Sequence, residues 1–195
     1  VLGRSGAREL RRTLGLSFQD PDDQLFSASV REDVAFGPRN LGLAEPEVEA
    51  RTARALEAVG AAHLADRPPY RLSGGEKRAA ALATVLAMEP GLLLLDEPTA
   101  GLDPRARRGL MRLVRSLPQT RLVASHDLDL VLELCDRVAV LARGKVAAEG
   151  LPGEVLLDEG LMERCGLELP LGARDRPARC RAERAAPAGE SEGTG

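Results

Sequence analysis

Hydrophobic residues along this chain alternate between short unbroken runs and longer stretches with helical spacing. The unbroken runs predict β-strands at residues 14–18, 92–95, 121–125 and 138–141, and Arg143-Gly144 predicts a turn into a further strand at 146–148. Apolar residues spaced three and four apart predict helices at 45–59, 74–89, 104–117 and 128–134. Strands that alternate with helices indicate an α/β fold with a mostly parallel sheet.

The stretch from about residue 27 to residue 78 contains no strand pattern, so we interpret it as a helical subdomain inserted into this fold. Downstream, Pro90-Gly91 ends a predicted helix and is followed at once by four leucines. This run is too short for a helix between such breakers. Its lack of alternation predicts a parallel strand that is buried on both faces.

The composition fits one globular domain with a polar tail. The 195 residues are 44% hydrophobic, and we place the domain at residues 1–172 and a disordered tail at 173–195, where large apolar side chains are scarce. A net charge of −3, with arginines scattered among acids, gives no electrostatic basis for binding nucleic acid. No apolar run approaches the roughly 18 residues that span a bilayer, so we expect any membrane association to require a partner.

Polar residues follow three of the predicted strands. Gln19 follows the first, Asp96 and Glu97 follow the run of leucines, and His126 follows the strand at 121–125. Ligands bind beyond the carboxyl ends of the strands in such sheets, so we expect these side chains at one edge. Asp96 is placed to hold Mg²⁺ and Glu97 to polarise a water, which are the tasks that phosphoryl transfer asks of acids. The alternative is a solvated turn, but the four leucines before the acids and the Pro-Thr after them favour the functional interpretation.

Residues 72–76, Leu-Ser-Gly-Gly-Glu, place a hydroxyl and two glycines at the start of a predicted helix. Ser73 and the unobstructed amides of Gly74 and Gly75 would form an anion site at the helix N-terminus. Ser73 and Glu76 also have the spacing of a capping box. Capping alone does not explain two consecutive glycines, which weaken a helix but allow a ligand to approach closely. We therefore expect both a cap and a phosphate site.

These motifs, in this order, resemble the nucleotide-binding subunits of ABC transporters over nearly the whole chain to about residue 171. Gln19 resembles the Q-loop, residues 72–76 the signature motif, residues 92–97 the Walker B motif, Asp103 the D-loop and His126 the switch histidine. The resemblance implies a P-loop NTPase-like α/β fold, ATP and Mg²⁺ as ligands, and a head-to-tail dimer in which the partner's signature motif completes each site. It implies catalytic roles for Glu97 and His126, metal contacts for Asp96 and Gln19, and nucleotide contacts for Gln19, Ser73, Gly74, Gly75, Glu76 and Asp103.

Two segments narrow the resemblance to the ATPases of energy-coupling factor importers. Residues 18–26 read Phe-Gln-Asp-Pro-Asp-Asp-Gln-Leu-Phe, and residues 30–38 read Val-Arg-Glu-Asp-Val-Ala-Phe-Gly-Pro. Membership implies that ATP hydrolysis powers uptake of a metal ion, cobalt or nickel, or of a vitamin. It implies a second ATPase subunit, identical or not, and a transmembrane coupling subunit as partners. The place of action would be the cytoplasmic face of the plasma membrane.

One feature of the family is missing from the printed sequence. The phosphate loop, G-x-x-x-x-G-K-[ST], occurs nowhere in these 195 residues, which begin with Val1. We therefore expect an N-terminally truncated form of the fold, which alone binds ATP weakly and does not hydrolyse it, whereas the intact protein does. Two alternatives are a non-catalytic remnant that lends only its signature motif to a partner, and a soluble ABC ATPase not linked to transport.

The segment that joins the sheet to the helical insertion is a candidate docking site for the membrane subunit. Aromatic residues make up 2% of the chain, yet Phe26 and Phe36 both fall in this segment, together with Leu25, Val30 and Val34. Aromatic side chains dominate interface energetics, so we expect Leu25 and Phe26 to contact a docked helix. The alternative is that both rings belong to the core.

Overall fold

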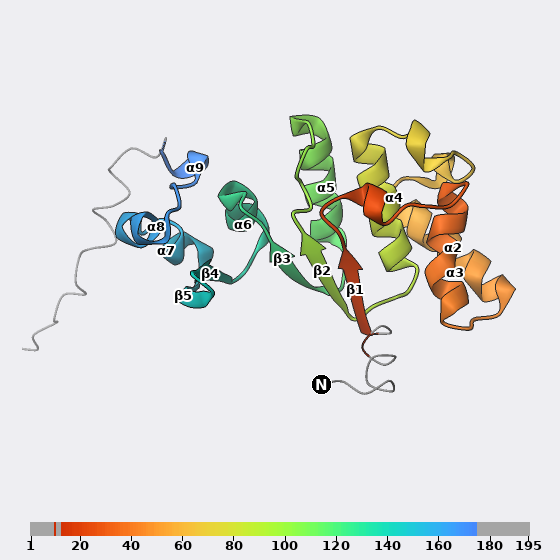
Figure 1. Cartoon of the computed structure of the whole chain (residues 1–195), viewed down its shortest axis with the longest axis horizontal. Coiled ribbons are helices and arrows are strands. Elements are labelled where there is room, and N and C mark those ends of the chain that lie inside the picture. The colour runs from red at the N-terminus through yellow and green to blue at the C-terminus, as the bar shows by residue number, and fades with distance from the viewer. Residues whose placement is uncertain (1–9, 11–12, 175–195) are drawn as a thin grey trace, which may run out of the picture. The chain divides into compact units, whose positions relative to one another are not determined.

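The computed structural model describes residue 10 and residues 13–174, which divide into two compact units between His126 and Asp127. In the first unit β1 (Leu14–Ser17), β2 (Leu92–Asp96) and β3 (Thr120–Ala124) form a parallel sheet in the order β1-β2-β3 (Figure 1). Leu14 pairs with Leu92, and Leu92 pairs with Thr120, so the three strands start level. The strands lie within about one residue of their predicted positions, and the predicted parallel sheet is confirmed.

Helices surround this sheet in the described part of the first unit. The α-helices are α2 (Val30–Asn40), α3 (Glu45–Ala58), α4 (Gly74–Leu86) and α5 (Pro104–Ser116), and the short 3-10 helices are η1 (Pro21–Asp23), η2 (Ala62–Leu64) and η3 (Pro69–Arg71). Side-chain caps begin three of the α-helices, because Ser29, Ser73 and Asp103 each accept a hydrogen bond from a backbone amide of the first turn. The stretch interpreted as a helical insertion is thus built of helices, with no strand between residues 27 and 78.

The core of this helical region lies between α2, α3 and α4, which contact one another on the β1 side of the sheet (Figure 1). Val30 and Val34 on α2, Val48 and Leu56 on α3 and Leu82 on α4 are at most 2% exposed. Helix α4 also packs against β1. A Cβ added at Gly15 would lie 2.2 Å from Cγ1 of Val85, so only glycine permits this approach of strand and helix.

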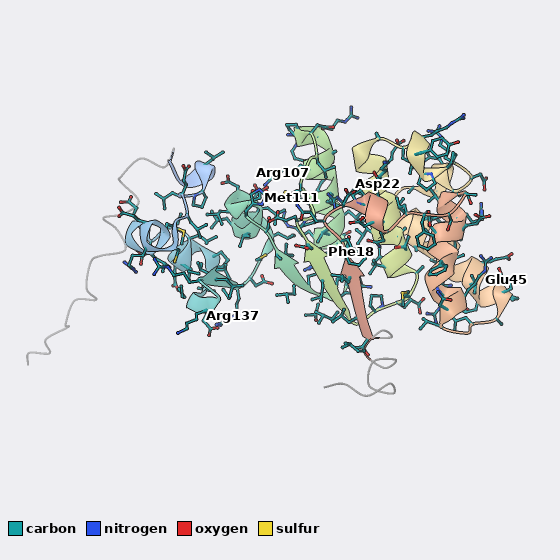
Figure 2. The ribbon with its side chains drawn as sticks, viewed as in Figure 1. Phe18, Asp22, Glu45, Arg107, Met111 and Arg137 are labelled. Atoms are coloured by element: carbon teal, nitrogen blue, oxygen red, sulfur yellow. The ribbon has the colours of Figure 1, made fainter. Side chains whose placement is uncertain are left out.

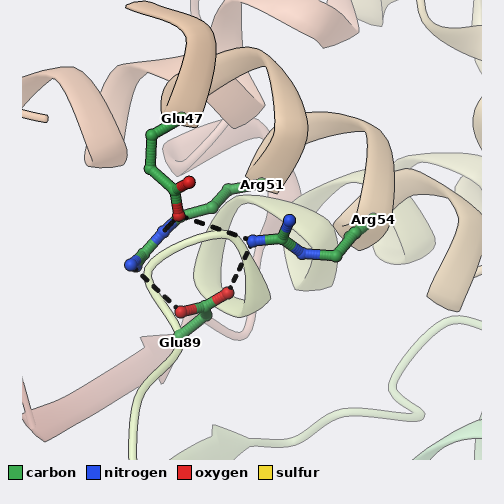
Figure 3. A network of polar contacts seen from close by, with 4 residues as sticks. All are labelled: Glu47, Arg51, Arg54 and Glu89. Atoms are coloured by element: carbon green, nitrogen blue, oxygen red, sulfur yellow. Dashed lines mark hydrogen bonds and ion pairs between the residues drawn. The ribbon is translucent and has the colours of Figure 1, made fainter. Parts of the chain in front are cut away.

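A network of ion pairs fastens α3 to the end of α4 (Figure 3). Nε of Arg51 lies 2.7 Å from Glu47, and its Nη2 lies 3.1 Å from Glu89, which follows α4. Nη2 of Arg54 lies 3.0 Å from Glu89 and 3.5 Å from Glu47. Glu89 has a positive φ of 52°, a conformation that side chains disfavour, and it carries the chain from α4 towards β2.

Strand β2 departs from the expectation of burial on both faces. Leu93 and Leu95 are 0% and 2% exposed, but Leu92 and Leu94 are only half-buried. Leu94 pairs in register with Leu122 of β3, which is 63% exposed, so the two share one face of the sheet. The prediction was therefore wrong for that face, because the described residues cover it only in part.

The second unit contains α6 (Leu128–Leu134), the antiparallel pair β4 (Val138–Ala142) and β5 (Lys145–Gly150), and the short helices α7 (Pro152–Val155), α8 (Glu159–Cys165) and α9 (Leu171–Arg174). Arg143 and Gly144 both have positive φ, at 51° and 74°, which suits the tight turn predicted there. Residues 175–195 of the predicted tail lie outside the described residues. Among the described residues, no helix is both long and apolar enough to cross a membrane.

Candidate nucleotide site

The carboxyl ends of β2 and β3 bring Glu97 and His126 together, as expected from their positions after parallel strands. The Glu97 amide donates to the Ala124 carbonyl at 2.9 Å, which extends the β2–β3 pairing by one residue beyond Asp96. Glu97 has a positive φ of 43°. A side chain in this disfavoured conformation is retained where the surroundings fix it, and such positions concentrate at functional sites.

Both carboxylate oxygens of Glu97 are held by residues that follow β3. Oε1 accepts from the His126 amide at 2.8 Å and lies 2.7 Å from Nδ1 of the same residue, while Oε2 accepts from the Ser125 hydroxyl at 3.2 Å. The ring of His126 is 80% exposed, whereas the Glu97 side chain is 17% exposed. A shielded carboxylate is thus paired with an imidazole that a ligand can reach.

An open hollow of about 670 Å³ lies at the ends of β1 and β2. The residues that line it are Phe18, Gln19, Asp20, Pro21, Asp23, Arg78, Asp96, Ala100 and Gly101. The structure therefore brings Gln19 and Asp96 to one cavity, as the sequence predicted. Carboxylate and amide oxygens are the donors that Mg²⁺ prefers, so the lining fits that ion.

Ser73 and Glu76 form the capping box expected at the start of α4. The Ser73 amide and hydroxyl both donate to Oε2 of Glu76 at 2.8 Å, and the Glu76 amide lies 3.4 Å from the Ser73 hydroxyl oxygen. The hydrogen bond from the Ser73 amide is the main cause that lowers the pKa of Glu76, and the Ser73 hydroxyl adds to it. None of the residues 73–76 is among those that line the hollow.

The two glycines of this turn differ in their surroundings. A Cβ at Gly74 would meet no atom within 4 Å, and the residue is exposed, so the space beside its Cα is open. A Cβ at Gly75 would lie 3.2 Å from the Cβ of Ala106 on α5, which is a tight contact. Helix packing is therefore a second reason for glycine at position 75, beside the close ligand approach that the sequence suggested.

Asp103 begins α5 rather than facing the hollow. Its Oδ1 accepts from the amides of Ala106 at 2.9 Å and Arg105 at 2.8 Å, and these bonds, led by that from Ala106, lower the pKa of Asp103. Asp103 is exposed. Asp103 is thus the N-cap of α5.

The comparisons with known proteins agree on the family. The sequence profile of the ABC transporter family matches residues 2–100. GSU1281 of Geobacter sulfurreducens, named among ABC transporter ATP-binding proteins, is 56% identical over 174 residues, which are 89% of this chain and 70% of that protein. This chain belongs to the ABC transporter ATP-binding family.

Relatives with more specific names also match this ABC transporter chain. The energy-coupling factor transporter ATP-binding protein EcfA of Methanothermobacter thermautotrophicus is 48% identical over 165 residues, which cover 83% of this chain and 53% of EcfA. Among solved structures, CbiO1 of Clostridium perfringens, part of the complex CbiONQ, has a TM-score of 0.74 and 44% identity over 88% of this chain and 70% of its own. MJ1267, the ATP-binding cassette of an ABC transporter, has a TM-score of 0.71 at 28% identity, over 80% of this chain and 70% of its own. These likenesses confirm the predicted ABC ATPase fold.

Sequence reasoning missed the residues that hold the loop after β1 in this ABC transporter protein. Gln24 anchors the loop, because its Nε2 donates to the Ala81 carbonyl at 2.8 Å and to the Thr84 hydroxyl at 2.6 Å, and its Oε1 accepts from the Phe18 amide. Lys77 binds Asp22 of η1 at 2.6 Å. Figure 2 labels Phe18 and Asp22, two of the loop residues in these contacts. Helical spacing gave no signal for them, since they depend on the approach of a distant segment to α4.

The candidate docking segment is only partly exposed. Phe26 and Phe36 are 65% and 48% exposed, and their rings meet edge to face with centroids 5.0 Å apart. Leu25 is 6% exposed and Val30 and Val34 are fully buried, so the expectation that Leu25 contacts a partner was wrong. Val30 and Val34 face the helical core because α2 presents one apolar side to α3 and α4, whereas the rings of Phe26 and Phe36 are exposed.

Proposed function

We propose that this protein is the ATP-binding and ATP-hydrolysing subunit of an energy-coupling factor importer, which powers uptake of a metal ion such as cobalt or nickel, or of a vitamin. The observation that carries the proposal is the Glu97 carboxylate, fixed at the end of a parallel strand by Ser125 and His126 next to Asp96. The relatives named EcfA and CbiO1 support the importer type. The chain spans 53 to 70% of the quoted relatives, so the activity is proposed for the whole protein.

The catalytic step would be attack of water on the γ-phosphate of ATP. Glu97 accepts hydrogen bonds in the structure and would orient the attacking water and accept its proton. His126, exposed and in contact with Glu97, would donate to the γ-phosphate and keep the carboxylate in place. Mg²⁺ bound by Asp96 and Gln19 would neutralise charge on the phosphates.

The second part of the proposal concerns the N-terminus of α4. Gly74 is open, and the positive end of the helix favours an anion. Ser73 to Glu76 do not line the hollow beside Asp96, which suits contact with the nucleotide of a partner subunit. Asp103 would lie at the same contact between the two subunits. In this arrangement two ATPase subunits, identical or different, share two composite sites.

The partner in the membrane would dock on Phe26 and Phe36. An exposed pair of rings gives a large apolar contact at small entropic cost, and such residues anchor many interfaces. Docking there would tie a transmembrane coupling subunit to the loop that carries Gln19. The ATPase would then act at the cytoplasmic face of the plasma membrane.

The test of importer function replaces Phe26 by Ser in a form of the protein that carries the phosphate loop. We expect capture of a co-expressed transmembrane coupling subunit to fall about tenfold or more, because an interface anchor contributes at least about 1.4 kcal/mol. ATP binding should stay at the wild-type level, since Phe26 is outside the hollow. Uptake of cobalt and nickel by the assembled complex then distinguishes a metal importer from a vitamin importer.

The matched control for that experiment is Leu141→Ser, which changes an apolar side chain that is 72% exposed in the second unit. We expect capture by this variant to equal that of the wild type. Equal capture by the Phe26 variant would contradict docking at the ring pair. Retained capture without any ATP-dependent uptake of either metal would exclude cobalt and nickel and leave a vitamin as the cargo.

A further inference from the structure

Arg78 on α4 is a buried cation to which the proposed chemistry gives no role. Its side chain is 5% exposed. Nη1 donates to the main-chain carbonyls of Phe18 at 3.1 Å and Gln19 at 2.6 Å, and Nη2 donates to the carbonyl of Ala100 at 3.1 Å. One guanidinium therefore binds two loops that are about 80 residues apart in the sequence.

Burying the charge of Arg78 costs free energy, so we infer that its hydrogen bonds are the reason for arginine at this position. Burial lowers the pKa of Arg78, against the influence of Asp20, yet a guanidinium stays protonated in proteins. Its acceptors are neutral carbonyls rather than a carboxylate, and its Nε has no hydrogen-bond partner among the residues that the structure describes. Burying a charge in this way is costly, and an apolar side chain would fill the same space at a lower cost.

The proposed mechanism requires the segments that Arg78 joins to keep fixed positions relative to one another. Gln19 follows β1 and lines the hollow with Asp96. Ala100 lies in the turn that leads from β2 to Asp103, the N-cap of α5. Arg78 itself lies in α4, one turn beyond the Ser73 cap. The rigid fork of a guanidinium fixes direction as well as distance, which a single ammonium cannot do.

We propose that Arg78 is a positioning residue that fixes the Gln19 loop and the Ala100 turn to α4, so that the three segments move as one unit. This inference rests on the proposed function for its catalytic consequence, but the clamp itself is a property of the chain. Through it, the loop beside Asp96 is linked to the Ser73 turn, which would serve the partner's nucleotide. A shift of either segment is then transmitted to the other.

Lys77, the neighbour of Arg78, provides the matched control. Its ammonium binds both carboxylate oxygens of Asp22, at 2.6 and 2.8 Å, so it also fastens the loop after β1 to α4. No contact of Lys77 reaches the Ala100 turn among those that the structure describes. Lys77→Met should therefore loosen one loop, whereas Arg78→Met should loosen both.

Hydrogen exchange of backbone amides in the 195-residue chain tests the clamp without nucleotide. The reporters are the amides of Gln24 and Leu25, which bond to Pro21, and those of Ala100 and Leu102, which bond to Glu97 and Thr99. We expect Arg78→Met to speed exchange in both groups about tenfold or more, the factor for losing one hydrogen bond to a charged group. Lys77→Met should speed exchange at Gln24 and Leu25 only. Arg78→Lys should protect at most one of the two groups better than Arg78→Met does.

Unchanged exchange at Ala100 and Leu102 in Arg78→Met would overturn the proposal. Equal acceleration at the β2 amides of Leu93 and Leu95 would also overturn it, because Arg78 would then support the whole fold. Arg54→Met serves as the general control, since Arg54 binds the surface carboxylates of Glu47 and Glu89 (Figure 3).

The catalytic consequence is measured in a form that carries the phosphate loop. The Mg²⁺ concentration for half-maximal phosphate release should rise severalfold in Arg78→Met, because Gln19 would no longer be held beside Asp96. A smaller folded fraction would lower the rate without moving this midpoint. An unmoved midpoint would overturn the catalytic consequence. Absence of hydrolysis in the wild type would instead refute the proposed function, and the exchange result would still decide on the clamp.

Discussion

At the scale of single residues, the site depends on a side chain held in a costly backbone conformation. Glu97 has a positive φ, and three hydrogen-bonding groups from Ser125 and His126 hold its carboxylate. The sequence placed Glu97 and His126 at one edge, because parallel strands end together. The role of Ser125 was not predicted, although its position directly before His126 at the end of β3 could have suggested it.

We expect His126→Ala to lower hydrolysis about 100-fold in a form that carries the phosphate loop, because Glu97 loses its imidazole partner and the γ-phosphate loses a donor. ATP affinity should change little. Ser125→Ala removes the 3.2 Å bond to Oε2 but leaves both contacts of His126 with Oε1, so it should have a smaller effect on the rate. Phosphate release and nucleotide titration on both variants check this order, and a larger loss for Ser125→Ala would contradict it.

A second prediction at this scale concerns the capping box of α4. The hydrogen bonds from Ser73 lower the pKa of Glu76, so they stabilise the fold above the pKa of the unfolded chain, and this stabilisation is lost as pH falls through the lower folded value. Glu76→Gln can still accept from Ser73 but does not titrate. Its urea midpoint should therefore fall less than that of the wild type as the pH is lowered from about 5 to about 3, through and below the usual glutamate pKa.

The control for the capping box is Glu57→Gln, which changes an exposed glutamate on α3. Its urea midpoint should keep the pH dependence of the wild type. A Glu76→Gln variant with the same acid sensitivity as the wild type would show that the Ser73 contacts do not contribute to folding stability.

At the scale of elements, hydrophobic spacing located most helices and strands but did not show which elements pack against each other. It located β1, β2, β3 and the β4–β5 hairpin, as well as α3, α4, α5 and α6, within a few residues. It gave no separate helix at residues 30–40, because Gly37-Pro38 reads as a breaker, although Pro38 lies in the last turn of α2. Burial of β2 was overestimated, since a strand pattern does not show what covers its second face.

The sheet predicts unequal costs for two leucine substitutions in paired strands. Leu93 in β2 is 0% exposed, so Leu93→Ala should lower the free energy of unfolding by about 2–5 kcal/mol through lost burial and a cavity. Leu122 in β3 is 63% exposed, and Leu122→Ala in the same 195-residue chain should cost less than about 1 kcal/mol. Urea unfolding of both variants measures the difference. Similar costs would contradict the described packing of the sheet.

At the scale of the whole molecule, the motifs predicted the ABC transporter fold, and the likeness to CbiO1 confirms it. Their positions after predicted strands placed Gln19, Asp96, Glu97 and His126 at one edge of the sheet. It could not show that Arg78, Lys77 and Gln24 fasten the Gln19 loop to α4, because those contacts join residues more than 50 positions apart. Long-range contacts of this kind depend on tertiary packing rather than on a local pattern.

The missing phosphate-loop motif gives a prediction for the 195-residue chain itself. Without backbone amides and a lysine around the phosphates, its affinity for Mg-ATP should be far weaker than that of a form extended with the family's phosphate loop. Titration calorimetry on both forms compares the dissociation constants. Micromolar binding by the 195-residue chain would mean that other residues supply the phosphate contacts.

The central claim is that Glu97 activates the attacking water, and steady-state phosphate release by Glu97→Gln tests it most directly. In a form with the phosphate loop, this variant should bind ATP like the wild type, accumulate as an ATP-bound dimer and lose at least about 99% of its turnover, because an amide cannot accept the proton. Phosphate release by Glu97→Gln at a rate close to that of the wild type would contradict the account.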